Sequence, residues 1–204
     1  MPGLRHAYGQ GQRLEDAVQD AGNVVGVGGP GVTSTPLMLA ELNAMDEAQF
    51  TAALGFVFEL SPWVVARAHA AGRFADREAL HAAMMAVLQA APEAEKLKLI
   101  RAHPELAGKA AIAKTLTAES RSEQAGAGLD RLTPDEYARF HALNTDYAAR
   151  FGFPFIICVR LNDKASILAA MERRLTHDPA SEIAEAIAQI GLIGRLRLFD
   201  VVTA

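Results

Sequence analysis

The sequence has little of what several classes of protein require. It contains a single cysteine, Cys158, so it cannot build an internal disulfide framework. No apolar run approaches the roughly 20 residues that a membrane-spanning helix needs. The formal net charge is −4, whereas a nucleic-acid interface needs clustered basic charge. We therefore expect neither membrane nor nucleic-acid partners.

Targeting signals are also missing from the printed sequence. The first residues do not show the charged-then-apolar pattern of a secretory signal. The last three residues, Val202, Thr203 and Ala204, are not a peroxisomal signal of the S-K-L kind. These observations predict a cytoplasmic protein.

Metal and nucleotide motifs are equally scarce. No pair of the six histidines stands in H-x-H or H-E-x-x-H spacing, and the lone cysteine has no C-x-x-C partner. The glycine-rich run at 24–31, VVGVGGPG, matches neither G-x-G-x-x-G nor a P-loop. The sequence therefore predicts no metal site and no nucleotide site. The histidines are His6, His69, His81, His103, His141 and His177.

The remaining composition is that of a globular, helical protein. Hydrophobic residues make up 50% and charged residues 22% of the 204 residues, a length that suits one domain with its own core. Residues 1–36 are rich in glycine and show no sustained periodicity. We interpret them as a flexible extension, and residues 37–204 as the functional domain.

From residue 37 onward the pattern is helical. Helix-start signals stand at Asp46, Ser61-Pro62, Asp76 and Thr133-Pro134, and Gly152 is placed to end a helix. We predict an all-α domain, a bundle of about eight or nine helices. The expected helices cover 37–44, 46–54, 61–72, the stretch after Asp76, 92–103, 133–152, 164–175 and 181–201.

One stretch breaks the helical pattern. Residues 153–159, FPFIICV, are short, β-branched and aromatic, and no second run of this kind is available to pair with them. We predict a buried extended segment that crosses the helical core. Its backbone N–H and C=O groups then need other partners, of which a bound polar ligand is one.

Two groups of polar residues that could take part in catalysis precede this segment in the sequence. His103 precedes Pro104, which disfavours helical geometry at the histidine and places it at a helix end. Ser120, Glu123 and Gln124 lie three and four residues apart, on one face of a helical turn. Each also has a structural interpretation, since a histidine can bond the last carbonyls of a helix and S-x-x-E is a capping box.

Six pieces of the sequence, taken together and in order, resemble the OHCU decarboxylases, which act on 2-oxo-4-hydroxy-4-carboxy-5-ureidoimidazoline in urate breakdown. The resemblance covers about residues 37 to 203. The pieces are ELSPW at 59–63, HPEL at 103–106, SRSEQAGAGL at 120–129, LN at 143–144 with Tyr147, FGFPF at 151–155 and RL at 197–198.

The resemblance implies a carboxy-lyase that forms (S)-allantoin, a homodimeric assembly and a set of site residues. The substrate carries its carboxylate beside a ring C=N bond that can accept the electrons, so no metal, pyridoxal phosphate or thiamine cofactor is expected. The implied catalytic residues are His103 and Glu123. The implied substrate-binding residues are Pro104, Ser120, Gln124, Phe155, Ile156, Ile157, Cys158, Val159 and Arg197.

Two other functions remain open at this stage. The same histidine and glutamate would serve a hydrolase that activates water against a related ureide. A Ser-His-acid triad can also be assembled on paper from Ser120, His103 and Glu123, although no G-x-S-x-G elbow is present. Alternatively, these residues cap and pack the helices of an interaction module without catalysis.

Overall fold

The structure is a computed structural model that describes residues 36–108 and 116–204. Within these residues the fold is all-α, as predicted, with nine α-helices, one 3-10 helix and two strands of two residues each. The extension predicted over residues 1–36 lies outside the described residues, apart from Pro36.

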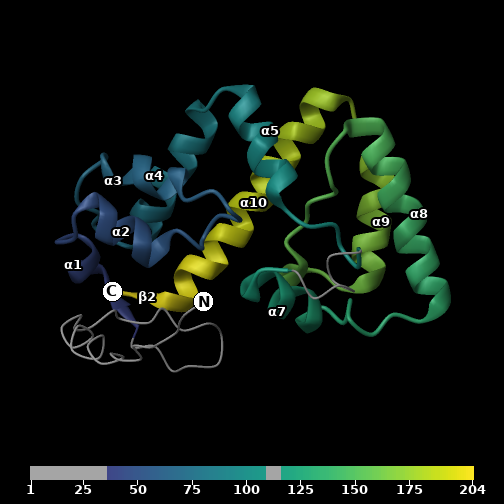
Figure 1. Ribbon diagram of the computed structural model, residues 1–204, viewed down its shortest axis with the longest axis horizontal. Coiled ribbons are helices and arrows are strands. Elements are labelled where there is room, and N and C mark those ends of the chain that lie inside the picture. Colours follow the sequence, from purple (N-terminus) through teal and green to yellow (C-terminus); the bar gives the residue numbers. More distant parts are fainter. Residues whose placement is uncertain (1–35, 109–115) are drawn as a thin grey trace, which may run out of the picture.

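The helices form two groups (Figure 1). The first group consists of α1 (Leu39–Leu42), α2 (Glu47–Leu54), α3 (Trp63–His69), α4 (Arg77–Ala90) and α5 (Glu93–Ala102). The second group consists of α7 (Ala118–Gly126), α8 (Pro134–Phe151), the 3-10 helix η1 (Val159–Leu161), α9 (Lys164–Arg174) and α10 (Pro179–Val201).

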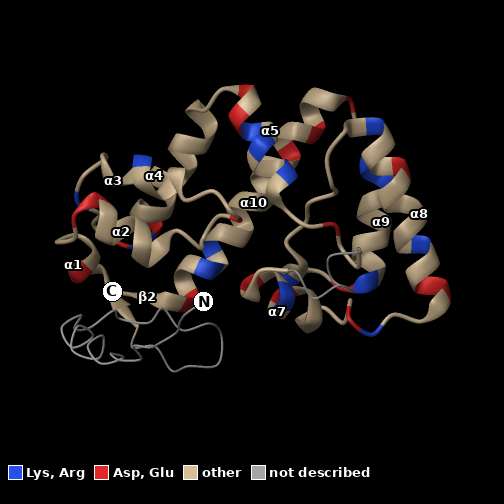
Figure 2. Ribbon diagram, viewed as in Figure 1, with Lys and Arg blue, Asp and Glu red and all other residues tan. Residues whose placement is uncertain are grey.

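Helix α10 belongs to the second group and reaches into the first. It crosses the molecule diagonally in Figure 1 and packs against both α4 and α5. Its central turns carry no charged residue, and its basic residues lie near its C-terminal end (Figure 2). Ala186, Ile190 and Gly194 on these turns are buried. An uncharged middle lets α10 pass through the core, because an unpaired buried charge is costly.

Most helix starts follow the local signals in the sequence. The side chains of Asp46, Asp76 and Thr133 accept hydrogen bonds from backbone N–H groups in the first turns of α2, α4 and α8. Gly152 ends α8 in the left-handed conformation, with φ of 73°, which glycine adopts at little steric cost.

Three predicted boundaries were wrong, and so was the structural interpretation of Ser120 as a helix cap. Leu37–Met38 is strand β1, which pairs in parallel with β2 (Val202–Thr203), so the first helix begins only at Leu39. Pro62, not Ser61, is the N-cap of α3. Thr117 caps α7, so Ser120 lies inside that helix rather than starting it. Finally, α10 begins at Pro179 because Asp178 caps it.

The segment after Gly152 is extended and buried, as predicted, but one residue shorter. Residues 153–158 form neither helix nor strand, and Val159 already belongs to η1. Phe155 meets the Tyr147 ring edge-on, with the centroids 5.3 Å apart. Such aromatic contacts anchor the segment against α8.

In the part of the chain that the structure describes, no helix combines the length and apolar character that a membrane span would require.

Candidate active site

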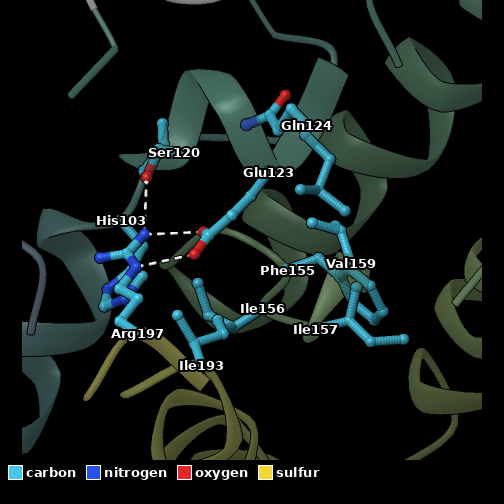
Figure 3. Close-up of a pocket in the computed structure, with 12 residues that line it drawn as sticks. His103, Ser120, Glu123, Gln124, Phe155, Ile156, Ile157, Val159, Ile193 and Arg197 are labelled. Carbon is cyan, nitrogen blue, oxygen red and sulfur yellow. Dashed lines mark hydrogen bonds and ion pairs between the residues drawn. The ribbon is translucent and has the colours of Figure 1, made fainter. Parts of the chain in front are cut away.

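A pocket lies where the end of α5, helix α7, the segment at 155–159 and α10 meet (Figure 3). Its empty space, counted together with the solvent at its open mouth, is about 360 Å³. The lining residues are His103, Pro104, Leu106, Ser120, Glu123, Gln124, Phe155, Ile156, Ile157, Val159, Ile193 and Arg197.

The pocket therefore brings together every predicted site residue except Cys158. Leu106 and Ile193 are lining residues that the sequence did not predict. Cys158 is buried, and its backbone is occupied by protein partners: its N–H donates to Gln189 Oε1, and its carbonyl accepts from Asn162 Nδ2, both at 2.9 Å.

His103 presents one ring nitrogen without a partner. It follows the last residue of α5 in an extended conformation, with φ of −76° and ψ of 140°. Its Nδ1 lies 3.0 Å from the Leu99 carbonyl oxygen, and because a carbonyl only accepts, Nδ1 carries the proton. Within the described residues nothing bonds to Nε2. Nε2 therefore offers a free lone pair.

Burial lowers the pKa of the His103 imidazole below its ordinary value, and this outweighs the hydrogen bond to Leu99, which would raise it. The charges of Glu59 and Glu123 also raise it, and that of Arg197 lowers it. The ring is consequently a neutral base at neutral pH, ready to accept a proton.

This shift sets an expected pH dependence. If neutral His103 is the base, kcat/KM should be constant above pH about 6.5 and should fall at lower pH, with its inflection below that value. The same shift makes folding stability fall as the pH drops from about 6.5 towards the folded-state pKa, because the unfolded chain then binds more protons.

A pH–rate profile from pH 4 to 9, recorded with circular dichroism at each pH, tests this expectation. The His103→Asn protein should retain only a residual rate without the inflection. An inflection above pH 7 that disappears in that variant would show that His103 works with a raised pKa instead.

Arg197 is the cation of the pocket, and carboxylates surround it. Its side chain is 4% exposed. Nε donates to Glu123 Oε1 at 2.8 Å and Nη2 donates to Glu123 Oε2 at 2.7 Å, a bidentate pair visible in Figure 3. Nη2 also reaches Ser120 Oγ at 3.2 Å. Burial would lower the pKa of the guanidinium, but Glu123 and Glu59 raise it, so Arg197 is always charged.

Glu59 is a part of this cluster that sequence reasoning missed. Its Oε2 accepts from Arg197 Nη1 at 3.0 Å and from Ser120 Oγ at 2.9 Å, and its Oε1 accepts from Thr117 Oγ1 at 2.7 Å. Burial would raise the pKa of this carboxyl, but the hydrogen bond from Thr117 and the charge of Arg197 hold it below its ordinary value. Glu59 is therefore an anionic anchor behind the pocket.

The sequence did contain a signal for Glu59. It opens the ELSPW piece at 59–63, one of the six pieces that carry the family resemblance. What no pattern could show is its distance to Ser120 and Arg197, which follow 61 and 138 residues later.

Gln124 holds the loop that carries His103 rather than pointing at a ligand with a free amide. Its Oε1 accepts from the Ala107 N–H at 3.1 Å, and its Nε2 donates to the Glu105 carbonyl at 3.4 Å. Asn144 Nδ2 donates to the Leu106 carbonyl at 2.9 Å. Two helices, α7 and α8, thereby fix the chain that follows His103.

The extended segment receives its backbone partners from α9 and α10. Arg174 Nη1 donates to the Ile156 carbonyl at 2.7 Å. Arg174 in turn bonds Glu182 through Nε at 2.8 Å, and Tyr147 and His177 also bond Glu182. Among the described residues no protein group bonds the backbone of Ile157, which leaves its N–H and C=O for water or a ligand.

No group of three or more His, Cys, Asp or Glu side chains is arranged to hold a metal ion in residues 36–108 and 116–204.

Comparison with known proteins identifies relatives of the whole domain. The sequence model of the OHCU decarboxylase family matches residues 43–199. The chain is 40% identical over 164 residues to a 2-oxo-4-hydroxy-4-carboxy-5-ureidoimidazoline decarboxylase of Halalkalicoccus jeotgali, covering 80% of this chain and 91% of that protein. It is 36% identical over 166 residues to the enzyme of the same name from Mus musculus, covering 81% and 93%.

A solved structure shares the fold. The crystal structure of an (S)-allantoin synthase superposes with a TM-score of 0.63 at 29% identity. The match covers 81% of this chain and 54% of that one, so this chain spans about half of that protein's length.

Proposed function

The chain belongs to the OHCU decarboxylase family, and from this premise we propose that it decarboxylates 2-oxo-4-hydroxy-4-carboxy-5-ureidoimidazoline to (S)-allantoin in urate degradation. The observation that supports this most directly is the unpartnered Nε2 of a neutral His103 in the same pocket as the guanidinium of Arg197. One group can move a proton, and the other can bind an anion.

The chemistry needs no more than these functions. Cleavage of the bond between C4 and its carboxylate releases carbon dioxide. The electron pair forms a C4=C5 double bond, and the C5=N pair moves onto nitrogen, which takes a proton. The C4 hydroxyl then loses its proton as C5 gains one, which gives the C4 carbonyl of allantoin. The net reaction consumes one proton, and the C=N bond serves as the electron sink.

His103 suits both proton steps at C4 and C5. Neutral Nε2 can accept the proton of the C4 hydroxyl, and the imidazolium so formed can return a proton to C5. Leu99 holds the ring by its Nδ1–H, which keeps Nε2 as the reacting nitrogen throughout. A single fixed donor delivers the proton to one face of C5, and this explains an (S) product.

The other groups of the pocket bind the remaining parts of the substrate. Arg197 supplies the positive charge for the carboxylate, and Glu123 can accept N–H groups of the ring or of the ureido chain. The backbone of Ile157 offers one donor and one acceptor to an amide. Ile193 adds an apolar wall to the pocket, which lowers the local polarity and favours loss of a charged carboxylate as neutral carbon dioxide.

The test is direct. Freshly prepared urate-oxidation product is incubated with the protein, and carbon dioxide and the optical activity of allantoin are followed together. Carbon dioxide release with (S)-allantoin supports the proposal, because uncatalysed decay gives no optical excess. Hydrolysis products without carbon dioxide would indicate the ureide hydrolase, and no change over the uncatalysed reaction would indicate a non-catalytic module. Exhaustive chelation with a metal-restored control tests whether a metal is needed.

Replacing Arg197 with lysine should lower kcat/KM by roughly tenfold or more, since one charge-assisted hydrogen bond contributes about 1.5–3 kcal/mol. Lysine keeps the charge but lacks the planar fork that binds a carboxylate bidentately. Steady-state kinetics of the folded variant measures this. Unchanged kcat/KM on the anionic substrate would remove Arg197 from the binding site.

We also propose that the active form is a cytoplasmic homodimer and that residues 1–36 form an extension to the domain at 37–204. The family resemblance supports the dimer. Light scattering measures the mass, and a decarboxylation assay the activity, of the full chain and of a variant that lacks residues 1–36. A monomeric, fully active protein would contradict the dimer.

A further inference from the structure

Every N–H group of the Arg197 guanidinium is already used. Arginine has five N–H donors. Nε and Nη2 bind the two oxygens of Glu123, Nη2 also binds Ser120, and Nη1 binds Glu59 at 3.0 Å and the Phe56 carbonyl at 3.5 Å. An anionic ligand therefore cannot bind this guanidinium unless one of these partners leaves.

The two carboxylates differ in how easily they can leave. Glu59 is 3% exposed, does not line the pocket, and also accepts hydrogen bonds from Thr117 and Ser120. Glu123 is 12% exposed and lines the pocket, and within the described residues its carboxylate bonds only Arg197. Displacing Glu123 from Arg197 breaks fewer hydrogen bonds than displacing Glu59 would. Glu123 is also the more exposed of the two, so its side chain has more room to move.

The net charge around Arg197 also favours displacement of Glu123 by an anionic ligand. Glu59, Glu123 and Arg197 sum to one negative charge beside a neutral His103. A ligand carboxylate that entered this pocket with Glu123 in place would be repelled by a like charge at close range. Glu123 binds the Nε–Nη2 edge of Arg197 through both carboxylate oxygens. A ligand carboxylate prefers the same bidentate geometry.

We propose that the carboxylate of the substrate takes the place of Glu123 on the Nε–Nη2 edge of Arg197. Glu59 and Ser120 stay bound and keep the guanidinium where it is. The displaced Glu123 carboxylate then accepts hydrogen bonds from the N–H groups of the same ligand. One exchange therefore binds the carboxylate of the ligand to Arg197 and frees Glu123 to bind its N–H groups. This inference rests on the proposed function for the identity of the ligand.

Two stable ureides test the exchange, because allantoate is an anion and (S)-allantoin is neutral. Only the anion has a carboxylate that could replace Glu123 on Arg197. Glu123→Gln removes the competing charge and weakens the pair with Arg197. We expect the variant to bind allantoate roughly tenfold tighter than the parent protein, since the lost pair is a charge-assisted one. Binding of (S)-allantoin, which needs no exchange, should stay equal or weaken. Isothermal titration calorimetry measures both.

Glu78→Gln is the matched control. Glu78 of α4 pairs with Arg195, which lies on α10 as Arg197 does. Both side chains of this pair are exposed, at 59% and 39%, so neither dissociation constant should change. A Glu123→Gln protein that binds allantoate equally or more weakly would overturn the exchange, because Glu123 would then remain on Arg197. Binding does not depend on turnover. A parent protein that releases no carbon dioxide would refute the proposed function, while the titrations would still decide the exchange.

Discussion

Replacing His103 with asparagine is expected to lower kcat by roughly 10²- to 10⁴-fold, the contribution of a well-placed acid–base group. Asparagine can still donate to the Leu99 carbonyl, as His103 Nδ1 does at 3.0 Å, but it cannot accept and return a proton near neutral pH. The measurement is single-turnover kinetics on fresh substrate. Enantiomeric excess is followed as well, because the substrate also decays without the enzyme.

Stability separates this role from a structural one. A catalytic His103 predicts a Tm and helical content close to those of the parent protein, with allantoin of little optical excess. A cap or packing residue predicts a lowered Tm with a modest kinetic loss. His81→Asn is a suitable control, since His81 also bonds a carbonyl, that of Gly191 at 2.9 Å, but lies outside the pocket. Near-normal formation of (S)-allantoin by His103→Asn would rule His103 out and move attention to Glu123.

Replacing Arg174 with methionine is expected to destabilise the protein by about 3–5 kcal/mol, the cost of breaking a buried ion pair by removing one partner. Arg174 is 2% exposed and Glu182 is fully buried. The variant leaves the Glu182 carboxylate without its arginine partner and the Ile156 carbonyl without its donor at 2.7 Å. Denaturant unfolding measures the loss, and the folded fraction should also show a raised KM because the segment at 155–159 is no longer held.

Two controls make this result interpretable. Arg139→Met removes an arginine whose ion pair with Glu172 is exposed, at 59% and 48%, so it should change the free energy of unfolding by less than about 1 kcal/mol. The double change Arg174→Met with Glu182→Leu removes both charges and should recover part of the lost stability. A double variant no more stable than Arg174→Met would mean that the loss comes from packing rather than from the unpaired charge.

The sequence predicted well those features that neighbouring residues decide. The caps at Asp46, Asp76 and Thr133 and the glycine that ends α8 were confirmed, because a cap depends on a side chain and an N–H group about three residues away. The non-helical character of residues 153–158 was also predictable, since Pro154 and the β-branched residues after it disfavour helix. The prediction failed at Leu37–Met38, where pairing with Val202–Thr203 overrode the local pattern.

The sequence by itself determined the all-α fold, the helix ends that a local cap or glycine sets and, through six ordered pieces, the family and the residues to examine. Tertiary structure alone decided how these residues are connected. Only the folded chain brings Glu59 to within 3.0 Å of Arg197 and places Arg174 on the Ile156 carbonyl. A hydrogen bond depends on positions in space to within a few tenths of an ångström. Helical periodicity specifies which face a residue occupies, and it says nothing about which distant residue that face will meet.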